Sequence, residues 1–202
     1  IETDISEPVK FRGKFDAIFH MAAITDPRYE NDKEIYNKNV EGFKLMLRLA
    51  QRDKSKFIYA STANLYGNGS VPMRETQKED IITTYGKSKL KIDQIASPYL
   101  DKMHIAGLRY FNVYGPGESH KGKPASMIYH LYKTMTAGKN PRLFKFGEQK
   151  RDYIYVKDVV DATLRALDAP SGIYNIGTGI ATSFNDVVDL INEILGTKLN
   201  PG

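Results

Sequence analysis

The sequence predicts an α/β protein whose core is a doubly wound parallel sheet. Two short apolar runs, residues 17–22 and 56–60, have the composition of strands that are buried on both faces. Between them, five apolar residues recur at spacings of four, three, four and three, which is typical of an amphipathic helix. These residues are Tyr36, Val40, Phe43, Leu47 and Ala50. Right-handed connections between such strands build a parallel sheet with helices on both faces.

A second helix and a third strand continue the alternation. The helix is expected to begin near Thr84 and to end before Pro98, because proline disfavours a helical conformation in the residue before it. The apolar run 105–110 follows with the character of a strand. After residues 114–117 the pattern loosens into a loop rich in glycine, lysine and proline.

The remainder of the chain predicts two further helices and short strands between them. One helix covers residues 127–135. The strands are expected over 142–146, 152–156 and 172–176. Ser183 and Asp186 have the spacing of a capping box, which opens a last helix that extends through Leu195 and is ended by Gly196.

The composition is that of an ordinary globular protein. Of the 202 residues, 41% are hydrophobic and 26% are charged, which excludes a disordered or fibrous chain. The absence of cysteine excludes a disulfide scaffold, a thiolate metal site and a cysteine nucleophile. No apolar run reaches the roughly 18 residues that a membrane-spanning helix needs. We therefore expect a cytoplasmic protein without a membrane partner.

The charge of the chain is weakly basic, with 29 basic and 24 acidic residues and a net charge of +5. The excess is scattered, and its densest run, Lys87, Lys89 and Lys91, contains no aromatic residue for base stacking. We therefore expect no nucleic acid partner. The four histidines lie far apart with no carboxylate at ligand spacing, so no metal site is expected either.

A hydroxyl pair and a tyrosine–lysine pair are the most informative polar residues. Ser61 and Thr62 end a predicted strand, at the edge where open α/β sheets bind ligands. Tyr85 and Lys89 begin the next helix, and a separation of four residues places them on one helical face. A neighbouring cation favours a phenolate, so Lys89 is expected to lower the pKa of Tyr85 and make it a proton shuttle. The Thr62 hydroxyl can hydrogen-bond a substrate oxygen that gains charge during hydride transfer.

The Tyr-x-x-x-Lys pattern by itself also occurs by chance on exposed helices, but here several other motifs accompany it in order. The matching segments are residues 4–5, 20–23, 39–42, 59–62, 66–67, 85–89, 109–116, 151–153 and 175–179. With them, the sequence resembles the extended short-chain dehydrogenase/reductase family, which acts on nucleotide sugars. The resemblance implies a Rossmann-like fold with an interleaved second region. The dinucleotide-binding domain would cover residues 1–115 and 151–180, and the substrate-binding region 116–150 and 181–202.

One motif of the family is missing from the sequence. The Gly-x-x-Gly-x-x-Gly turn, which follows the first strand and holds the cofactor pyrophosphate, is absent. Residues 1–5 resemble the end of the third strand of the family. We therefore expect an N-terminally incomplete chain that lacks roughly two β and α units, and also an incomplete C-terminal region. The residue that selects between NAD and NADP would precede residue 1, so NADP is expected from the resemblance alone and NAD stays open.

Within the family, the loop 117–123 and the segment 144–152 are most similar to members that invert C6 of an ADP-linked glycero-manno-heptose, a lipopolysaccharide precursor. The resemblance implies an isomerase that removes a hydride to form a transient ketone and returns it to the opposite face. Inversion through a planar ketone needs proton transfer on two faces. The resemblance assigns these transfers to Tyr85 and Lys121. A lysine base needs a lowered pKa, for which partial burial beside cations such as Lys123 would suffice.

Alternative readings of these features stay open. Lys121 can instead contact the diphosphate of the substrate or solvent. Another NAD(P)-dependent nucleotide-sugar epimerase, such as a UDP-hexose 4-epimerase, shares the hydroxyl, tyrosine and lysine and has no need of the loop 117–123. A non-catalytic relative would share only the fold. A small nucleotide sugar is the expected partner of either enzyme, and homo-oligomerisation is left open.

The resemblance also assigns the individual site residues. The catalytic set is Tyr85, Lys121, Thr62 and Lys89. The cofactor-binding set is Asp4, Ile5, Ala22, Ala23, Asn39, Tyr85, Lys89 and Val113, and the substrate-binding set is Thr62, Asn112, Lys123, His130, Phe144 and Arg151. Arg151 suits a diphosphate, because a guanidinium group makes paired hydrogen bonds to phosphate oxygens. Two assignments have structural alternatives: Asn39 can tie two strands together through its amide, and His130 can be a packed helix residue.

Overall fold

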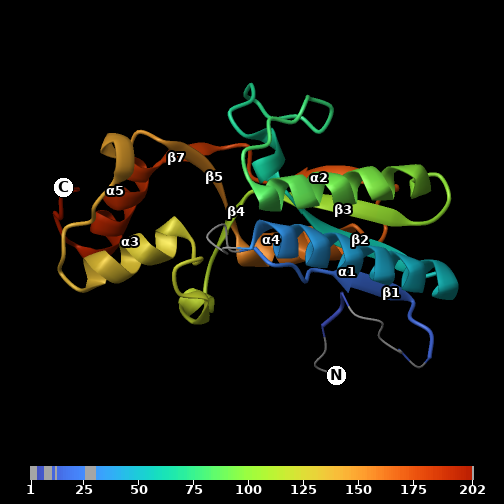
Figure 1. The fold of residues 1–202 in the computed structure, drawn as a ribbon. Helices are drawn as coiled ribbons and strands as arrows, with labels where there is room; N and C mark the ends of the chain where they lie inside the picture. Colours follow the sequence, from blue (N-terminus) through green and yellow to red (C-terminus); the bar gives the residue numbers. More distant parts are fainter. Residues whose placement is uncertain (1–3, 7–10, 12, 26–30, 202) are drawn as a thin grey trace. The chain divides into compact units, whose positions relative to one another are not determined.

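The computed structural model describes residues 4–6, 11, 13–25 and 31–201, and it divides the chain into two units (Figure 1). The first unit contains residues 1–110 and 161–176, and the second contains residues 111–160 and 177–202. Both units therefore combine segments that are distant in the sequence. Residues 1–3, which are part of the segment that resembles the end of a strand, lie outside the described residues.

A four-stranded parallel sheet forms the centre of the first unit. Its strands are β1 (Ala17–His20), β2 (Lys56–Thr62), β3 (Ile105–Tyr110) and β6 (Gly172–Ile176), in the order β1-β2-β3-β6. The register pairs Thr62 with Tyr110, and Tyr110 with Ile176. The carboxyl ends of β2, β3 and β6 therefore meet at one edge of the sheet, as in other open α/β sheets.

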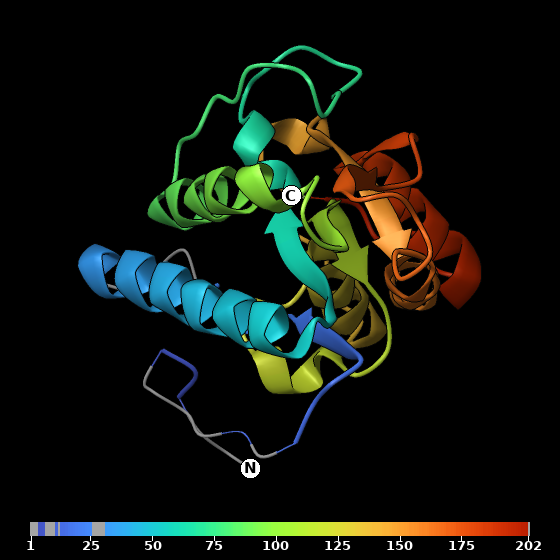
Figure 2. The same cartoon turned by 90° about the vertical axis from the view of Figure 1, so that its right-hand side faces the viewer.

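Two helices cover one face of this sheet. They are α1 (Asp32–Asp53) and α2 (Thr84–Ala96), which lie side by side in Figures 1 and 2. Phe43 of α1 and Ile92 of α2 pack against Phe57 and Tyr59 of β2. Gly107 of β3 makes room for this packing, because a Cβ atom there would collide with the Tyr59 phenol. Four of the five predicted apolar residues of α1 are buried, whereas Tyr36 is half-buried and its neighbour Ile35 is buried instead.

The opposite face of the sheet is covered by the segment that follows α4 (Val156–Arg165). Ile58 of β2 and Leu108 of β3 pack there against Ala166 and Leu167. Because alternate side chains of a strand point to opposite faces, Phe57 and Ile58 belong to different cores. The helices α1 and α2 on one face, and the end of α4 with the turn after it on the other, confirm the predicted doubly wound α/β class.

The second unit contains a small mixed sheet and two helices. The strands β4 (Asn112–Tyr114), β5 (Lys150–Tyr155) and β7 (Ala181–Ser183) lie in that order, with β4 parallel and β7 antiparallel to β5. The helices α3 (Met127–Thr136) and α5 (Phe184–Leu195) pack through Leu131, Met135, Val188 and Ile191. The predicted capping box of Ser183 and Asp186 and the end of α5 at Gly196 are confirmed.

Four short 3₁₀ helices complete the described structure, and one of them corrects a prediction. They are η1 (Ala63–Tyr66), η2 (Ser97–Tyr99), η3 (Glu118–Lys121) and η4 (Phe144–Gly147). The predicted strand over 142–146 is wrong, because η4 occupies most of it. Positive φ angles of 57° at Phe146 and 74° at Gly147 are incompatible with an extended strand. The Asn185 amide holds this turn by donating to the Phe146 carbonyl at 2.9 Å.

The division into units differs from the predicted regions at β5. The prediction places residues 151–180 with the larger region, whereas β5 pairs with β4 and β7 inside the second unit. Strand pairing of this kind depends on partners distant in the sequence. Among the described helices, none combines the length and the apolar composition that a membrane span requires.

Candidate active site

The tyrosine and lysine singled out in the sequence lie on the first turns of α2. Thr83 is the N-cap residue, and its hydroxyl accepts a hydrogen bond from the Gly86 N–H at 3.0 Å. A larger residue at Gly86 is disfavoured, because a Cβ atom there would lie 2.9 Å from the Ile81 side chain. The local sequence therefore sets where α2 begins, and with it the helical face that carries Tyr85 and Lys89.

Burial, and not the neighbouring ammonium, determines the direction in which the pKa of the Tyr85 phenol is shifted. It raises the pKa of Tyr85 to about 12, against a hydrogen bond from the Thr62 side chain that lowers it. The expectation that Lys89 makes the phenol more acidic is therefore wrong for this structure. The Lys89 Nζ lies 5.7 Å from the centre of the Tyr85 ring and donates its hydrogen bond to the Ala60 carbonyl at 2.7 Å.

Lys89 is a buried cation, with only 1% of its surface exposed. Burial lowers the pKa of Lys89 to about 8, and the charge of Asp93, one helical turn further along α2, raises it. His20 at the end of β1 is buried as well. Burial, together with the charge of Lys89, lowers the pKa of His20 to about 4, so its ring is neutral at pH 7.

The two hydroxyl groups at the end of β2 have different surroundings. The Thr62 Oγ1 accepts a hydrogen bond from the Asn64 N–H at 3.2 Å and is also the hydroxyl that bonds to Tyr85. The Ser61 hydroxyl donates to the Asp93 carboxylate at 3.1 Å. Thr62 is therefore the hydroxyl associated with the phenol, whereas Ser61 belongs to a buried polar network.

Asp4 and Ile5, predicted to lie against the cofactor, are anchored to α1. The Asp4 carboxylate accepts hydrogen bonds from the Ser6 hydroxyl and N–H and pairs with Lys38 at 3.1 Å. The Ser6 hydroxyl and N–H, then Lys38, lower the pKa of Asp4 to about 2. Ile5 lies against α1 at Gly42, where an added Cβ atom would be 3.3 Å from its side chain. The glycine of the motif at 39–42 thus permits the close approach of Ile5.

Asn39 connects the segment after β1 to α2. Its Oδ1 accepts from the Ile24 N–H at 2.8 Å, and its Nδ2 donates to the Ile24 carbonyl at 3.1 Å and to the Ser88 hydroxyl at 3.1 Å. The Ser88 hydroxyl in turn donates to the Tyr85 carbonyl at 2.7 Å. The amide of Asn39 therefore has a structural role, although it ties a loop to a helix and not two strands together.

The end of β1 fits the predicted dinucleotide. Ala22 is exposed and Ala23 half-buried, and both carry only a methyl group, so a flat ring can approach the backbone there. Tyr85 and Lys89 belong to the same unit. The two alanines leave room beside the backbone, Tyr85 supplies a phenol and Lys89 an ammonium group. Together these groups suit a nicotinamide and its ribose. The glycine-rich turn that would hold the pyrophosphate is not among the 202 residues.

Lys121 lies at the end of η3 in the second unit, beside an acid. Its side chain is 44% exposed, and its Nζ is 3.8 Å from the buried Glu118 carboxylate. The same carboxylate accepts from the Gly115 N–H at 3.1 Å, the Ser126 N–H at 2.7 Å and the Ser126 hydroxyl at 2.8 Å. Glu118 therefore closes the loop that carries Lys121, and the sequence analysis did not identify it.

Lys123 and His130, both assigned to the substrate, are connected within the second unit. Lys123 is exposed, and the His130 Nε2 lies 3.2 Å from its carbonyl oxygen. His130 is half-buried on α3, where its ring contacts that of Tyr129. The contacts of His130 are those of a packed helix residue, which is the structural alternative to a role in substrate binding. The side chain of Lys123 is exposed to solvent.

The remaining assigned residues of the second unit line β4, β5 and η4. Asn112 on β4 is exposed and donates to the Asp152 carbonyl at 3.2 Å, and Val113 pairs with Ile154. Arg151 on β5 is exposed and lies 5.9 Å from the centre of the Phe184 ring. The assigned aromatic residue of η4, Phe144, is 69% exposed.

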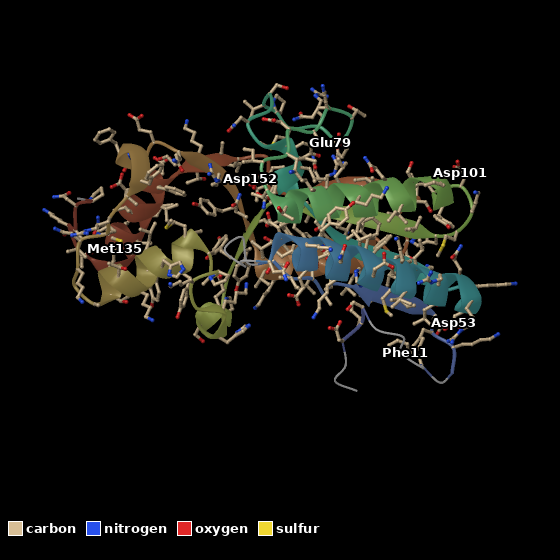
Figure 3. The ribbon with its side chains drawn as sticks, in the orientation of Figure 1. Phe11, Asp53, Glu79, Asp101, Met135 and Asp152 are labelled. Atoms are coloured by element: carbon tan, nitrogen blue, oxygen red, sulfur yellow. The ribbon has the colours of Figure 1, made fainter. Side chains whose placement is uncertain are left out.

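Asp152, labelled in Figure 3, organises the glycine-containing segment after β6. Its carboxylate accepts hydrogen bonds from the Thr178 N–H at 2.9 Å, the Thr178 hydroxyl at 2.8 Å and the Gly179 N–H at 2.7 Å. Gly177 must remain small, because an added Cβ atom would lie 2.7 Å from the same carboxylate. The sequence contains both partners as motifs, at 151–153 and 175–179, but nothing in their spacing predicts that they meet.

The structure thus brings Thr62, Tyr85, Lys89 and Asn39 together in the first unit. The residues assigned to the substrate, apart from Thr62, belong to the second unit, as does Lys121. Within the described part of the chain, no three histidine, aspartate or glutamate side chains are grouped so that they could hold a metal ion.

Comparisons with known proteins agree with this architecture. Residues 2–177 match the NAD dependent epimerase/dehydratase family. A curated ADP-L-glycero-D-manno-heptose-6-epimerase of Alkalilimnicola ehrlichii is 38% identical over 194 residues, which cover 91% of this chain and 61% of the relative. The chain therefore spans less than two thirds of the length of this relative.

Solved structures of related enzymes have the same fold. The crystal structure of the Helicobacter pylori ADP-L-glycero-D-manno-heptose-6-epimerase superimposes with a TM-score of 0.94 at 39% identity, covering 100% of this chain and 66% of that one. A UDP-glucose 4-epimerase of Thermotoga maritima, solved with UDP-glucose, gives a TM-score of 0.84 at 31% identity and covers 92% of this chain and 63% of that one.

Proposed function

Because the chain belongs to the NAD dependent epimerase/dehydratase family, we propose that the full-length protein is a nucleotide-sugar epimerase that inverts C6 of ADP-glycero-manno-heptose. The observation that carries the reaction type is the group of Thr62, Tyr85 and Lys89 beside the carboxyl end of β2. The substrate is proposed from the relatives named as heptose epimerases and from the loop around Lys121.

When bound, an oxidised nicotinamide cofactor would supply a hydride acceptor and a positive charge. Tyr85 is the proposed proton carrier on one face of the sugar. In the resting protein its high pKa keeps the proton on the phenol oxygen, which suits donation to a ketone oxygen. A positive charge near that oxygen favours the phenolate, which suits removal of a proton from the C6 hydroxyl.

Thr62 and Lys89 support the proton transfer by Tyr85 in this proposal. The Thr62 hydroxyl bonds to the phenol and is therefore close enough to hydrogen-bond the same substrate oxygen. The ammonium of Lys89 lies 5.7 Å from the centre of the phenol ring, and we propose that it also contacts the bound cofactor. Neither residue needs to change its backbone position for this, because both belong to regular elements, β2 and α2.

Lys121 is proposed to transfer the proton on the opposite face of the ketone. Its side chain is accessible, and Glu118 fixes both ends of the loop that carries it. Exposed Arg151 and Lys123 would hold the diphosphate of the substrate, since both present positive charge to solvent.

The finer details of the proposal rest on the resemblance of the sequence. NADP is proposed as the cofactor, whereas the family description specifies only dependence on NAD. A nucleotide sugar is the proposed partner. A cytoplasmic location is proposed from the cysteine-free sequence.

The experiment that tests the function supplies ADP-glycero-manno-heptose and NADP to the full-length protein and follows the configuration at C6 by NMR. We expect conversion of one C6 epimer into a mixture of both, with no net consumption of NADP. Turnover of UDP-glucose without inversion of the heptose would replace the proposal by a 4-epimerase. Parallel assays with NAD show which cofactor supports the faster reaction.

A further inference from the structure

A buried carboxylate follows Lys89 by about one turn of α2. Asp93 is four residues after Lys89 and is 3% exposed. Its Oδ1 accepts a hydrogen bond from the Tyr59 hydroxyl at 3.1 Å, and its Oδ2 accepts from the Ser61 hydroxyl at 3.1 Å and from the Arg109 Nε at 3.1 Å. The carboxylate is therefore held in one orientation by donors from both β2 and β3.

Arg109 connects this carboxylate to the rest of the first unit. Its guanidinium is 2% exposed and donates to the Tyr66 hydroxyl at 3.0 Å and to the Glu79 carboxylate at 3.3 Å. Glu79, labelled in Figure 3, belongs to the segment between β2 and α2. The Tyr66 hydroxyl donates in turn to the Asn175 Oδ1 on β6 at 2.6 Å. Arg109 thus makes contact with acids on two sides.

Lys89 has no such direct anionic partner among the described residues. Its Nζ donates to a neutral group, the Ala60 carbonyl, at 2.7 Å. The ionisable groups that face it are Tyr85 and Asp93 on α2 and His20 on β1, and His20 is neutral at pH 7. Arg109 lies beyond Asp93. An ammonium group excluded from water needs a compensating negative charge, and here Asp93 is the group that supplies it.

We infer that Asp93 is a positioning residue that keeps the buried Lys89 charged at the pH at which the enzyme works, with Arg109 and Ser61 holding its carboxylate in place. The inference deepens the proposed function and rests on the role of Lys89 in it. Asp93 itself is not expected to touch the substrate or the cofactor. Its effect on the reaction is exerted through the charge of the Lys89 ammonium, which lies 5.7 Å from the centre of the Tyr85 ring.

The test is the pH dependence of kcat in the full-length Asp93→Asn protein. An asparagine is isosteric and retains an oxygen for Ser61 and Arg109, but it removes the negative charge. The charged form of Lys89 then becomes less favourable, so its pKa falls below about 8 and Lys89 loses its proton at a lower pH. We expect the alkaline side of the profile to move to lower pH by about one unit, with kcat reduced more than KM changes.

Two matched variants separate charge from architecture. Tyr59→Phe removes a hydrogen bond from Asp93, and Glu79→Gln removes an acid from Arg109, while both leave the Asp93 charge in place. We expect both variants to keep the wild-type pH profile even where their thermal stability is reduced. A purely structural Asp93 would give three variants with the same pH profile, which would overturn the inference.

Asp93→Asn leaves Arg109 with one acid fewer, which destabilises the buried pair. If this protein does not fold, a second variant is tested in its place. Asp93→Asn combined with Arg109→Met removes both charges of the buried pair, a replacement that proteins often tolerate. The alkaline side is again expected to move to lower pH, by less than in Asp93→Asn, because the positive charge of Arg109 is lost together with the negative charge of Asp93. Lys89→Met distinguishes a failure of the proposed function from a failure of the inference. Retained turnover would refute the proposed function, whereas lost turnover together with an unshifted Asp93→Asn profile would refute the inference alone.

Discussion

The Asn39 amide on α1 donates a hydrogen bond to the Ser88 hydroxyl on α2 at 3.1 Å, and through Ser88 it is connected to the backbone of Tyr85. The same amide makes two hydrogen bonds to Ile24, just after β1. One buried side chain therefore sets the position of the candidate phenol relative to the carboxyl end of the neighbouring strand.

Replacing Asn39 by alanine is expected to lower the free energy of unfolding by about 1–3 kcal/mol, because the Ile24 N–H and carbonyl lose their buried partner. Urea denaturation followed by circular dichroism measures this change. Asn37→Ala is the control, since Asn37 is an exposed asparagine on the same helix. Equal stability of the two variants would contradict the structural role of Asn39.

Replacing Tyr85 by phenylalanine is expected to reduce kcat for C6 inversion by about 10²–10⁴-fold, the contribution typical of a positioned acid–base group. The phenol oxygen is the only atom removed, so the ring packing and the stability should change little. Rates are measured by NMR in the full-length protein. Tyr36→Phe, on α1, should retain wild-type turnover, and turnover retained by Tyr85→Phe would show that the phenol is not needed.

Replacing Lys121 by alanine is expected to abolish inversion of the heptose while leaving hydride removal detectable, because only one face of the ketone keeps its proton carrier. Inversion is followed by NMR, and transient reduction of the cofactor by its absorbance. Lys133→Ala removes another exposed lysine of the second unit and should have no effect. Unchanged inversion in Lys121→Ala would eliminate the second proton carrier from the mechanism.

Replacing Glu118 by glutamine is expected to destabilise the second unit by about 1–2 kcal/mol at pH 7, because glutamine cannot accept all three hydrogen bonds. Burial raises the pKa of Glu118, but the Ser126 and Gly115 donors outweigh burial and hold the pKa below the ordinary glutamate value of 4.5.

The sign of the pH dependence follows from this lowered pKa. The ionised Glu118 contributes its stability above about pH 4.5, and this contribution is lost as the pH falls through the lower value of the folded protein. The difference between wild type and Glu118→Gln should therefore shrink in urea denaturation below about pH 4. A difference that stays constant down to pH 3 would mean that the carboxylate charge is not involved.

Local patterns in the sequence sufficed for the elements and for part of the site. The spacing of Tyr85 and Lys89 requires only one helical turn, and the capping box at Ser183 with Gly196 requires only neighbouring residues. Strands buried on both faces are recognisable because both of their faces are apolar. These features depend on interactions within a few residues, so the sequence by itself determined them.

The tertiary structure decided everything that depends on distant partners. The pairing of β5 with β4 and β7, the contact of Asp93 with Arg109, and the contact of Asp152 with Thr178 join residues whose spacing predicts no contact. The direction of the Tyr85 pKa shift belongs to the same class. It depends on how much water the packed chain excludes, and burial is a property of the whole fold, which no short segment contains.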